Sequence, residues 1–276
     1  MRQTERGQET WIPIGAPALV TPDFLSGDGL DAFIKLPKAW LQECDLKHGE
    51  VCAPKHSKQV LPKRLISVEN PKEPKIIATA DLALDPNKTE YIALSHRWGK
   101  MPQDARTKQC NIKQREKMIP KGELPASFKN AIAITSALNC NYLWIDSLCI
   151  LQDPDGEFNE QADKMQTTFS GAYCVLAACN GDGASDGFLK DRESRCVKMG
   201  DIYVSTVTND FERDVLRSPL SSRGWVLQER ALARRTIFFT DIQMYFECGD
   251  GIRCETLAKL KKQVTESLNK GMTDMV

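Results

Sequence analysis

Short apolar segments alternate with helical patterns along the middle of the chain, and this alternation is the feature that most limits its fold. The strand-like segments are YIALS, YLWID and AYCVLAA, at residues 91–95, 142–146 and 172–178. Between them, residues 124–139 and the stretch from Phe158 to Phe169 repeat their apolar residues every three or four positions, as amphipathic helices do. Strands that alternate with helices predict an α/β fold with a central, mostly parallel sheet and flanking helices.

The segments on either side of this alternation have other patterns. Residues 1–30 are rich in Gly, Pro and Thr and read as a loose leader. Residues 31–90 predict an extension packed on the core, with one helix interrupted at Pro37 and two short strands. The main domain is expected over residues 91–255, with additional strands near its C-terminal end. Residues 256–276 are expected to form a C-terminal helix or a linker.

Charge and hydropathy exclude several classes of protein. The 276 residues include 37 basic and 37 acidic side chains, so no net field draws the chain to nucleic acid or to an anionic membrane. No apolar run approaches the roughly 20 residues that span a bilayer, and the N-terminal residues lack the apolar core of a secretory signal. We therefore expect a cytoplasmic protein with no membrane span and no nucleic-acid partner.

The cysteines suggest one alternative that involves a metal. Several of the ten lie in apolar stretches, where reduced thiols pack as small hydrophobic groups. Cys44, His48, Cys52 and His56 recur every four residues, and a bent segment could wrap them around a tetrahedral zinc ion. This spacing matches no standard zinc finger, so packed cysteines with surface histidines are the favoured interpretation and no metal is expected.

Four sequence blocks, in order, resemble the fungal heterokaryon-incompatibility (HET) domain. They are YIALSHRWG, LPASFKNAIAITSALNCNYLWIDSLCILQD, EQADKMQTTFSGAYCVLAA and SSRGWVLQERALARRTIFFTDIQMYFEC, which together cover about Tyr91 to Cys248. The resemblance implies a cell-death effector that acts when fungal cells of unlike genotype fuse. HET domains are usually one module of a larger protein, so the chain is expected to be an isolated domain or a short member.

The HET resemblance also suggests a distant kinship to TIR domains, many of which cleave the nicotinamide–ribose bond of NAD. Such cleavage develops positive charge on the ribose, so a carboxylate is needed close to the sugar. Glu160 is the candidate, because it stands about one turn into the helix that follows YLWIDSLCI. Glu157 is the competitor, and the alternative interpretation of Glu160 is an acid favoured only by the helix dipole.

Other polar residues follow the predicted strands and are candidates for substrate binding. Ser95, His96, Arg97, Trp98, Asp146, Cys149, Arg223 and Glu229 make up this set. Arg97 could bind a pyrophosphate and Trp98 could stack on a base or fill the core. Asp146 needs a partner at its strand end, and a structural pairing is an equally good interpretation. The family commonly has an aromatic residue in the place of His96, and for Cys149 packing is favoured over a nucleophilic role.

The expected function is therefore a cell-death effector that hydrolyses NAD, or a related nucleotide, once it has assembled into a homo-oligomer or with a regulatory partner. NAD is the substrate in this hypothesis, and no cofactor is expected. The alternative is a non-enzymatic module that signals death by self-association or by recruiting partners. The sequence leaves the trigger, the preferred nucleotide and the geometry of the assembly open.

Overall fold

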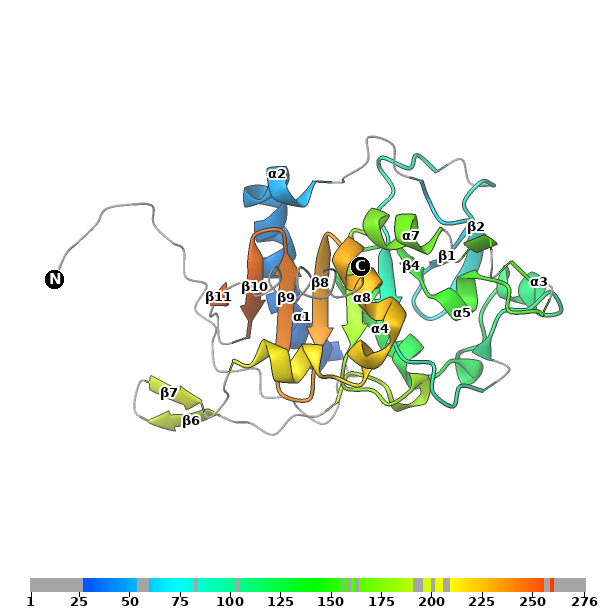
Figure 1. Cartoon of the computed structure of the whole chain (residues 1–276). Helices are drawn as coiled ribbons and strands as arrows, with labels where there is room; N and C mark the ends of the chain where they lie inside the picture. Colours follow the sequence, from blue (N-terminus) through cyan, green and yellow to red (C-terminus); the bar gives the residue numbers. More distant parts are fainter. Residues whose placement is uncertain are drawn as a thin grey trace, which may run out of the picture.

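The computed structural model shows one large sheet with helices packed on it (Figure 1). The structure describes residues 27–53, 60–81, 84–102, 105–154, 156–157, 160–161, 164–190, 196–199, 202–205, 209–255 and 259–260. Within these ranges no helix combines the length and the apolar character that crossing a membrane requires. The predicted α/β class is confirmed.

The large sheet has nine strands in the order β11-β10-β9-β8-β5-β3-β4-β1-β2. Their bounds are β1 Arg64–Ser67, β2 Lys75–Ala78, β3 Ile92–Ser95, β4 Tyr142–Trp144, β5 Cys174–Ala178, β8 Arg235–Phe239, β9 Met244–Cys248, β10 Gly251–Cys254 and β11 Lys259–Leu260. The two strands of the predicted extension, β1 and β2, join this same sheet, because β1 pairs with β4. A separate two-stranded sheet contains β6 (Cys196–Met199) and β7 (Ile202–Ser205).

The prediction of a mostly parallel sheet is wrong for the sheet as a whole. The four central strands, β4, β3, β5 and β8, are parallel to one another, as the alternation with helices predicts. The other five pairings are antiparallel. Short connections such as the turn between β9 and β10 can join only antiparallel strands, whereas parallel strands need long crossovers. The result is a mixed nine-stranded sheet, and the expected TIR-like arrangement is not evident in it.

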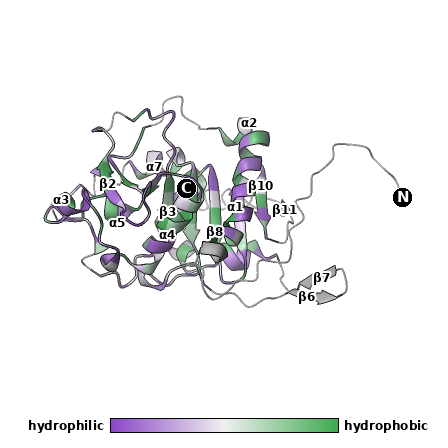
Figure 2. Cartoon of the chain, turned by 180° about the vertical axis from the view of Figure 1, so that it is seen from behind, coloured by the Kyte–Doolittle hydropathy of each residue, from purple (hydrophilic) through white to green (hydrophobic). Residues whose placement is uncertain are grey.

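Helices cover both faces of the sheet. The longer ones are α1 (Gly27–Lys47), α4 (Ala126–Ala137), α7 (Met165–Gly171) and α8 (Gly224–Leu232). Side chains of α1 pack on β8 and β9, where Phe33 stacks on Phe239 and Trp40 on Phe246. Figure 2, which views the chain from behind, shows α1 lying over this face of the sheet. Val226 of α8 instead joins an apolar cluster that contains Phe238. Since Phe238 and Phe239 are adjacent in a strand, they point to opposite faces, so α1 and α8 lie on opposite sides of the sheet.

The predicted interruption of the first helix at Pro37 is also wrong, because α1 runs without a break from Gly27 to Lys47. A proline inside a helix costs about 3 kcal/mol, because one backbone hydrogen bond is lost. Phe33, Trp40 and Leu41 are each buried on this helix. Burying each such side chain stabilises the fold by about 1.5–3 kcal/mol, which together exceeds the cost of the proline.

Shorter elements connect these parts. They are α2 (Gly49–Cys52), α3 (Ile112–Arg115), α5 (Asp146–Cys149), η2 (Lys121–Glu123), η3 (Ala184–Asp186), η4 (Glu212–Leu216) and η5 (Leu220–Ser222). The helix expected around Phe158 to Phe169 is described over α7, while Phe158 itself lies outside the described residues. Of the last predicted segment, Lys259–Leu260 form a strand and residues 261–276 are not described.

Candidate functional site

The end of β3 brings polar groups to the edge of the parallel part of the sheet. Ser95 is the last residue of β3 and is in register with Ala177 of β5. Ala177 belongs to the apolar cluster on the α8 side of the sheet. Successive residues of a strand point to opposite faces, so Ser95 faces α8 while His96 turns towards the other face. The carboxyl ends of parallel strands are where ligands commonly bind in open α/β sheets.

Glu229 meets Ser95 from the inner face of α8. The hydroxyl of Ser95 donates a hydrogen bond to Oε2 of Glu229. Both side chains are buried, with only 3% of Ser95 and 6% of Glu229 exposed. Burial raises the pKa of Glu229 to about 7, and the negative charge of Asp146 acts in the same direction, while the bond from Ser95 and the positive charge of Arg223 oppose the rise. The carboxyl group therefore changes its protonation state close to neutral pH.

Asp146 supplies the second carboxylate of this region. It is the first residue of α5, directly beyond β4, and its Oδ2 accepts a hydrogen bond of 2.7 Å from Nε1 of Trp98. The backbone N–H of Ser147 donates to Oδ1 at 2.6 Å. The guanidinium of Arg106 lies 5.0 Å from the centre of the Trp98 ring, on its face. The predicted need of Asp146 for a partner is thus met by the indole N–H of Trp98 and by the backbone N–H of Ser147.

His96 is a buried ring rather than an exposed ligand. Its imidazole packs edge-on against Phe128 of α4, with the ring centres 5.1 Å apart. Burial lowers the pKa of His96, so the ring is neutral at neutral pH, although the charge of Asp146 opposes this shift. The guanidinium of Arg223 donates a hydrogen bond to the backbone carbonyl of His96. Arg223 therefore links the N-terminal end of α8 to the end of β3.

The model of the heterokaryon incompatibility protein (HET) family matches residues 91–229, which is half of the chain. The chain belongs to the HET family. No curated protein and no solved structure matches it. The matched region starts just before β3 and ends at Glu229, so it contains all the residues of the Ser95–Glu229 and Trp98–Asp146 pairs. Family membership indicates a role in heterokaryon incompatibility.

Arg97 and Gly99, which follow β3, contact the glycine-rich loop that follows β5. Arg97 is partly exposed and forms an ion pair of 3.5 Å with Asp182. Gly99 has a φ of +55°, and a Cβ at this position would lie 2.7 Å from the Cα of Gly183. Only glycine tolerates this combination of a left-handed backbone and a close neighbour. The tight contact holds the loop after β3 against the loop after β5.

Glu160, the predicted catalytic residue, is exposed, whereas Ser95 and Glu229 are buried. Its side chain is 62% exposed and forms an ion pair of 2.6 Å with Lys164, which lowers its pKa. Glu157, the competitor, accepts hydrogen bonds from Lys63 and Arg64, and these bonds lower its pKa to about 2. Both glutamates therefore have basic partners, and neither has a hydrogen bond to Ser95, Trp98 or Asp146 in the described structure.

Cys149 is part of the core. Its side chain is 3% exposed and belongs to the main apolar cluster. Burial raises the pKa of this thiol to about 12, so it is neutral at physiological pH. A neutral buried thiol is a poor nucleophile, which agrees with the packing interpretation.

The sequence placed Glu229 among the binding residues but did not single it out. Helical spacing in the sequence does indicate that Glu229 is buried, because it stands three positions after Val226 on α8 and so shares the buried face of the helix. An acid on the apolar face of a helix is buried and needs a polar partner. Arg106, which covers Trp98, had no such signal, since only the folded chain brings it to the indole.

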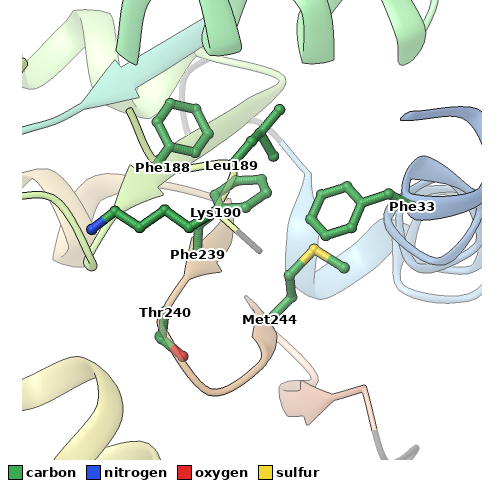
Figure 3. Close-up of a pocket in the computed structure, with 7 residues that line it drawn as sticks. All are labelled: Phe33, Phe188, Leu189, Lys190, Phe239, Thr240 and Met244. Carbon is green, nitrogen blue, oxygen red and sulfur yellow. The ribbon is translucent and has the colours of Figure 1, made fainter. Parts of the chain in front are cut away.

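One small cavity lies elsewhere, between α1 and the turn that joins β8 to β9 (Figure 3). It has a volume of about 10 Å³, enough for at most a water molecule. Its lining residues are Phe33, Phe188, Leu189, Lys190, Phe239, Thr240 and Met244. A space of this size holds no organic ligand, so the polar cluster at the end of β3 remains the candidate site.

Proposed function

We propose that this HET domain is a cell-death effector that hydrolyses NAD, or a related nucleotide, at the bond between nicotinamide and ribose when it is assembled. The observation that carries the proposal is the buried Ser95–Glu229 pair, whose carboxyl group has a pKa of about 7. Strongly shifted carboxyl groups are concentrated at catalytic sites, although structural networks also produce them. The pair also lies at the sheet edge where open α/β folds bind nucleotides.

The reaction requires one carboxylate and one water molecule. The bond between C1′ of the ribose and the nicotinamide nitrogen breaks, and its electron pair moves to the nitrogen, which turns the pyridinium into neutral nicotinamide. The ribose becomes an oxocarbenium-like cation that ionised Glu229 stabilises. Water then adds to C1′ and loses one proton to Glu229 or to solvent. The products are nicotinamide, ADP-ribose and one proton.

Neighbouring groups supply the remaining contacts in this proposal. Ser95 would orient the carboxylate of Glu229, and the partly exposed Arg97, which pairs with Asp182, would bind a phosphate. Gly224, at the start of α8, is exposed, and a Cβ there would meet no atom within 4 Å. In this proposal the open space around Gly224 leaves room for the ligand at the start of α8.

The burial of Ser95 and Glu229 fits an enzyme that is active only after assembly, because a substrate reaches the pair only if its cover moves. The non-enzymatic alternative is supported by a different observation. Leu216 and Leu227 are exposed over 40% and 57% of their surfaces, on η4 and α8 respectively. Exposed large apolar side chains of this kind suit contact with a second copy or a partner protein.

The test is nicotinamide release by the purified chain incubated with NAD, followed by chromatography. The sample is measured as a dilute monomer, under crowding, and as a fusion to an oligomerising domain. Glu229→Gln is expected to lower the rate about 10²–10³-fold, since an electrostatic group of the transition state is removed. The rate of the unmodified chain should rise with pH to a plateau above about 7, as Glu229 ionises.

Glu160→Gln is both the matched control and the test of the other candidate carboxylate. If Glu229 is the catalytic group, this exposed variant keeps full activity. If Glu160→Gln abolishes nicotinamide release and Glu229→Gln does not, the residue predicted from the sequence is the correct one. Absence of release from an assembled sample that still kills cells on expression would favour the non-enzymatic alternative.

A further inference from the structure

Three cysteines and one histidine meet at the end of the first helix, outside the region that the HET model matches. Cys44 lies in α1, Cys52 ends α2 and His48 lies between these two helices, while Cys248 is the last residue of β9. One ligand atom of each residue lies within 4.8 Å of all the others. Ligands 2.3 Å from a tetrahedral zinc ion are about 3.8 Å apart, so a contraction of about 1 Å or less would give that geometry.

The local backbone explains how the first three residues share one face. The N–H of His48 bonds to the carbonyl of Cys44 at 3.0 Å, and the N–H of Cys52 bonds to that of His48 at 2.8 Å. These are helical bonds across four residues, although the backbone bends at His48, where φ is −114° and ψ is 22°. Side chains four residues apart on a helix lie on the same face. Figure 1 shows α2 beside the turn between β9 and β10, and Cys248 ends β9 directly before this turn.

The imidazole of His48 has the orientation of a metal ligand. Its Nδ1 lies 3.6 Å from the sulfur of Cys248, while its Nε2 lies 3.4 Å from a carboxylate oxygen of Asp250. Histidines that bind metals commonly donate their second ring N–H to a carboxylate, which fixes the tautomer. In this geometry Nε2 carries the proton towards Asp250, and the lone pair of Nδ1 faces the three sulfur atoms.

The turn after β9 also supports the sulfur atoms. The N–H of Gly249 donates to the sulfur of Cys52 at 3.2 Å, as backbone amides do to thiolate ligands. A Cβ at Gly249 would lie 2.6 Å from the carbonyl oxygen of Val51 and 3.1 Å from that same sulfur. Position 249 is therefore restricted to glycine by the close approach of the turn to α2.

Burial and charge are consistent with a closed, structural centre. Cys44, Cys52 and Cys248 are at most 4% exposed, and the side chain of His48 is 10% exposed. Three thiolates and one Zn²⁺ carry a net charge of −1. Arg234 donates to the carbonyl of Cys52 at 3.3 Å, and the positive charge of Arg235 acts on Cys44. The guanidinium of Arg234 therefore offsets the charge of such a centre, while Arg235 is shared between Cys44 and an ion pair with Asp45.

We propose that Cys44, His48 Nδ1, Cys52 and Cys248 bind one zinc ion in a tetrahedral structural site. Binding releases one proton from each thiol that is neutral beforehand, and no electron is transferred. Zinc prefers nitrogen and sulfur ligands, and four protein ligands leave no open position for catalysis. His56, the fourth ligand of the sequence-based alternative, lies outside the described residues, and Cys248 takes its place. The packing interpretation favoured from the sequence could not include Cys248, which is nearly 200 residues away from Cys52 along the chain.

This centre would fasten the end of α1 to the β9–β10 turn, joining two segments that both lie outside the matched region. A cross-link between residues so distant in sequence stabilises the fold by restricting the unfolded chain, as a metal site or a disulfide does. The expected consequence is a protein whose melting temperature depends on zinc, independently of any activity on NAD.

The test uses the whole chain expressed in zinc-supplemented medium and purified with a reductant that does not chelate metals. Elemental analysis should find about one zinc per chain, the content of a single four-ligand site. Replacing zinc with Co²⁺ should produce a thiolate-to-cobalt charge-transfer band in the absorption spectrum. A strong chelator should lower the melting temperature of the unmodified chain. Cys248→Ser should lose the zinc and this response to chelator.

Cys140→Ser is the matched control, because Cys140 is also buried but lies outside the proposed zinc cluster, with its thiol bonded to the carbonyls of Glu90 and Tyr142. It should keep the zinc. Zinc retained in full by Cys248→Ser would overturn the proposal. So would a metal-free chain that gives no cobalt band, or one in which thiol titration reveals a disulfide among these cysteines. If Cys248→Ser fails to fold, the cobalt spectrum of the unmodified chain decides.

Discussion

Replacing Glu229 with glutamine should make the protein more stable above pH 7 and leave its stability nearly unchanged at pH 5. The change keeps the size of the side chain and an oxygen that can accept the hydrogen bond from Ser95. It removes the ionisable group from a buried position. The difference in stability between the two proteins therefore measures the free-energy cost of burying a carboxylate at position 229.

The magnitude follows from the raised pKa, about 7 in the folded chain against an ordinary 4.5. Below pH 4.5 the carboxyl group is protonated in both the folded and the unfolded chain, so its ionisation does not change the free energy of unfolding. Between pH 4.5 and 7 the unfolded chain ionises while the folded chain does not, and stability falls. Above pH 7 the loss of stability reaches its full value of about 3 kcal/mol. Allowing about 1 kcal/mol for a weaker bond from Ser95, we expect Glu229→Gln to gain about 2 kcal/mol at pH 8.

The assay is urea unfolding of both proteins at pH 5 and pH 8, followed by tryptophan fluorescence. Glu157→Gln is the control, and its effect on stability at pH 8 should have the opposite sign. The bonds from Arg64 and Lys63 lower the pKa of Glu157 to about 2. That carboxylate stabilises the fold above pH 4.5, and its contribution disappears as the pH falls towards 2. Its replacement should cost about 1 kcal/mol at pH 8, a value reduced for its partial contact with solvent.

Equal destabilisation of Glu229→Gln at pH 5 and pH 8 would contradict a raised pKa for Glu229. Such a result would mean that the carboxylate is well solvated or fully paired in the folded chain. A gain in stability with loss of nicotinamide release would instead be typical of a catalytic group held at a cost to the fold.

Two further predictions concern the loop after β3. Gly99→Ala should destabilise the fold by about 1–3 kcal/mol, because alanine is strained at a φ of +55° and its Cβ would collide with the backbone of Gly183. Gly122→Ala, at an open position, should be nearly neutral in the same urea titration, and equal effects of the two changes would contradict the argument. Trp98→Phe removes the indole donor to Asp146 and should cost about 1.5–3 kcal/mol. A double-mutant cycle with Asp146→Asn measures this coupling by urea unfolding, and a coupling energy of zero would show that the bond contributes nothing.

The sequence alone predicted the parts of this fold that depend on local pattern. The strands at YIALS, YLWID and AYCVLAA and the helix over residues 126–137 carry their own periodicity, and all four are present. Their alternation also predicted that the central strands are parallel, because crossover helices separate them. The HET family was recognisable because its blocks are contiguous stretches of sequence.

Which side chains meet depends on how distant segments of the chain pack. The sequence favoured Glu160 because it begins a helix after a strand, yet its described ion pair is with Lys164, while Glu229 reaches Ser95 from 134 positions away. In the same way, the four-residue spacing of Cys44, His48 and Cys52 indicated a possible cluster, but Cys248 is added only by the pairing of β9 within the sheet. Periodicity is a local property of the chain, whereas the partner of a buried carboxyl or thiol is set by how distant segments pack. Sequence pattern therefore determined the elements, and packing determined the chemistry at their ends.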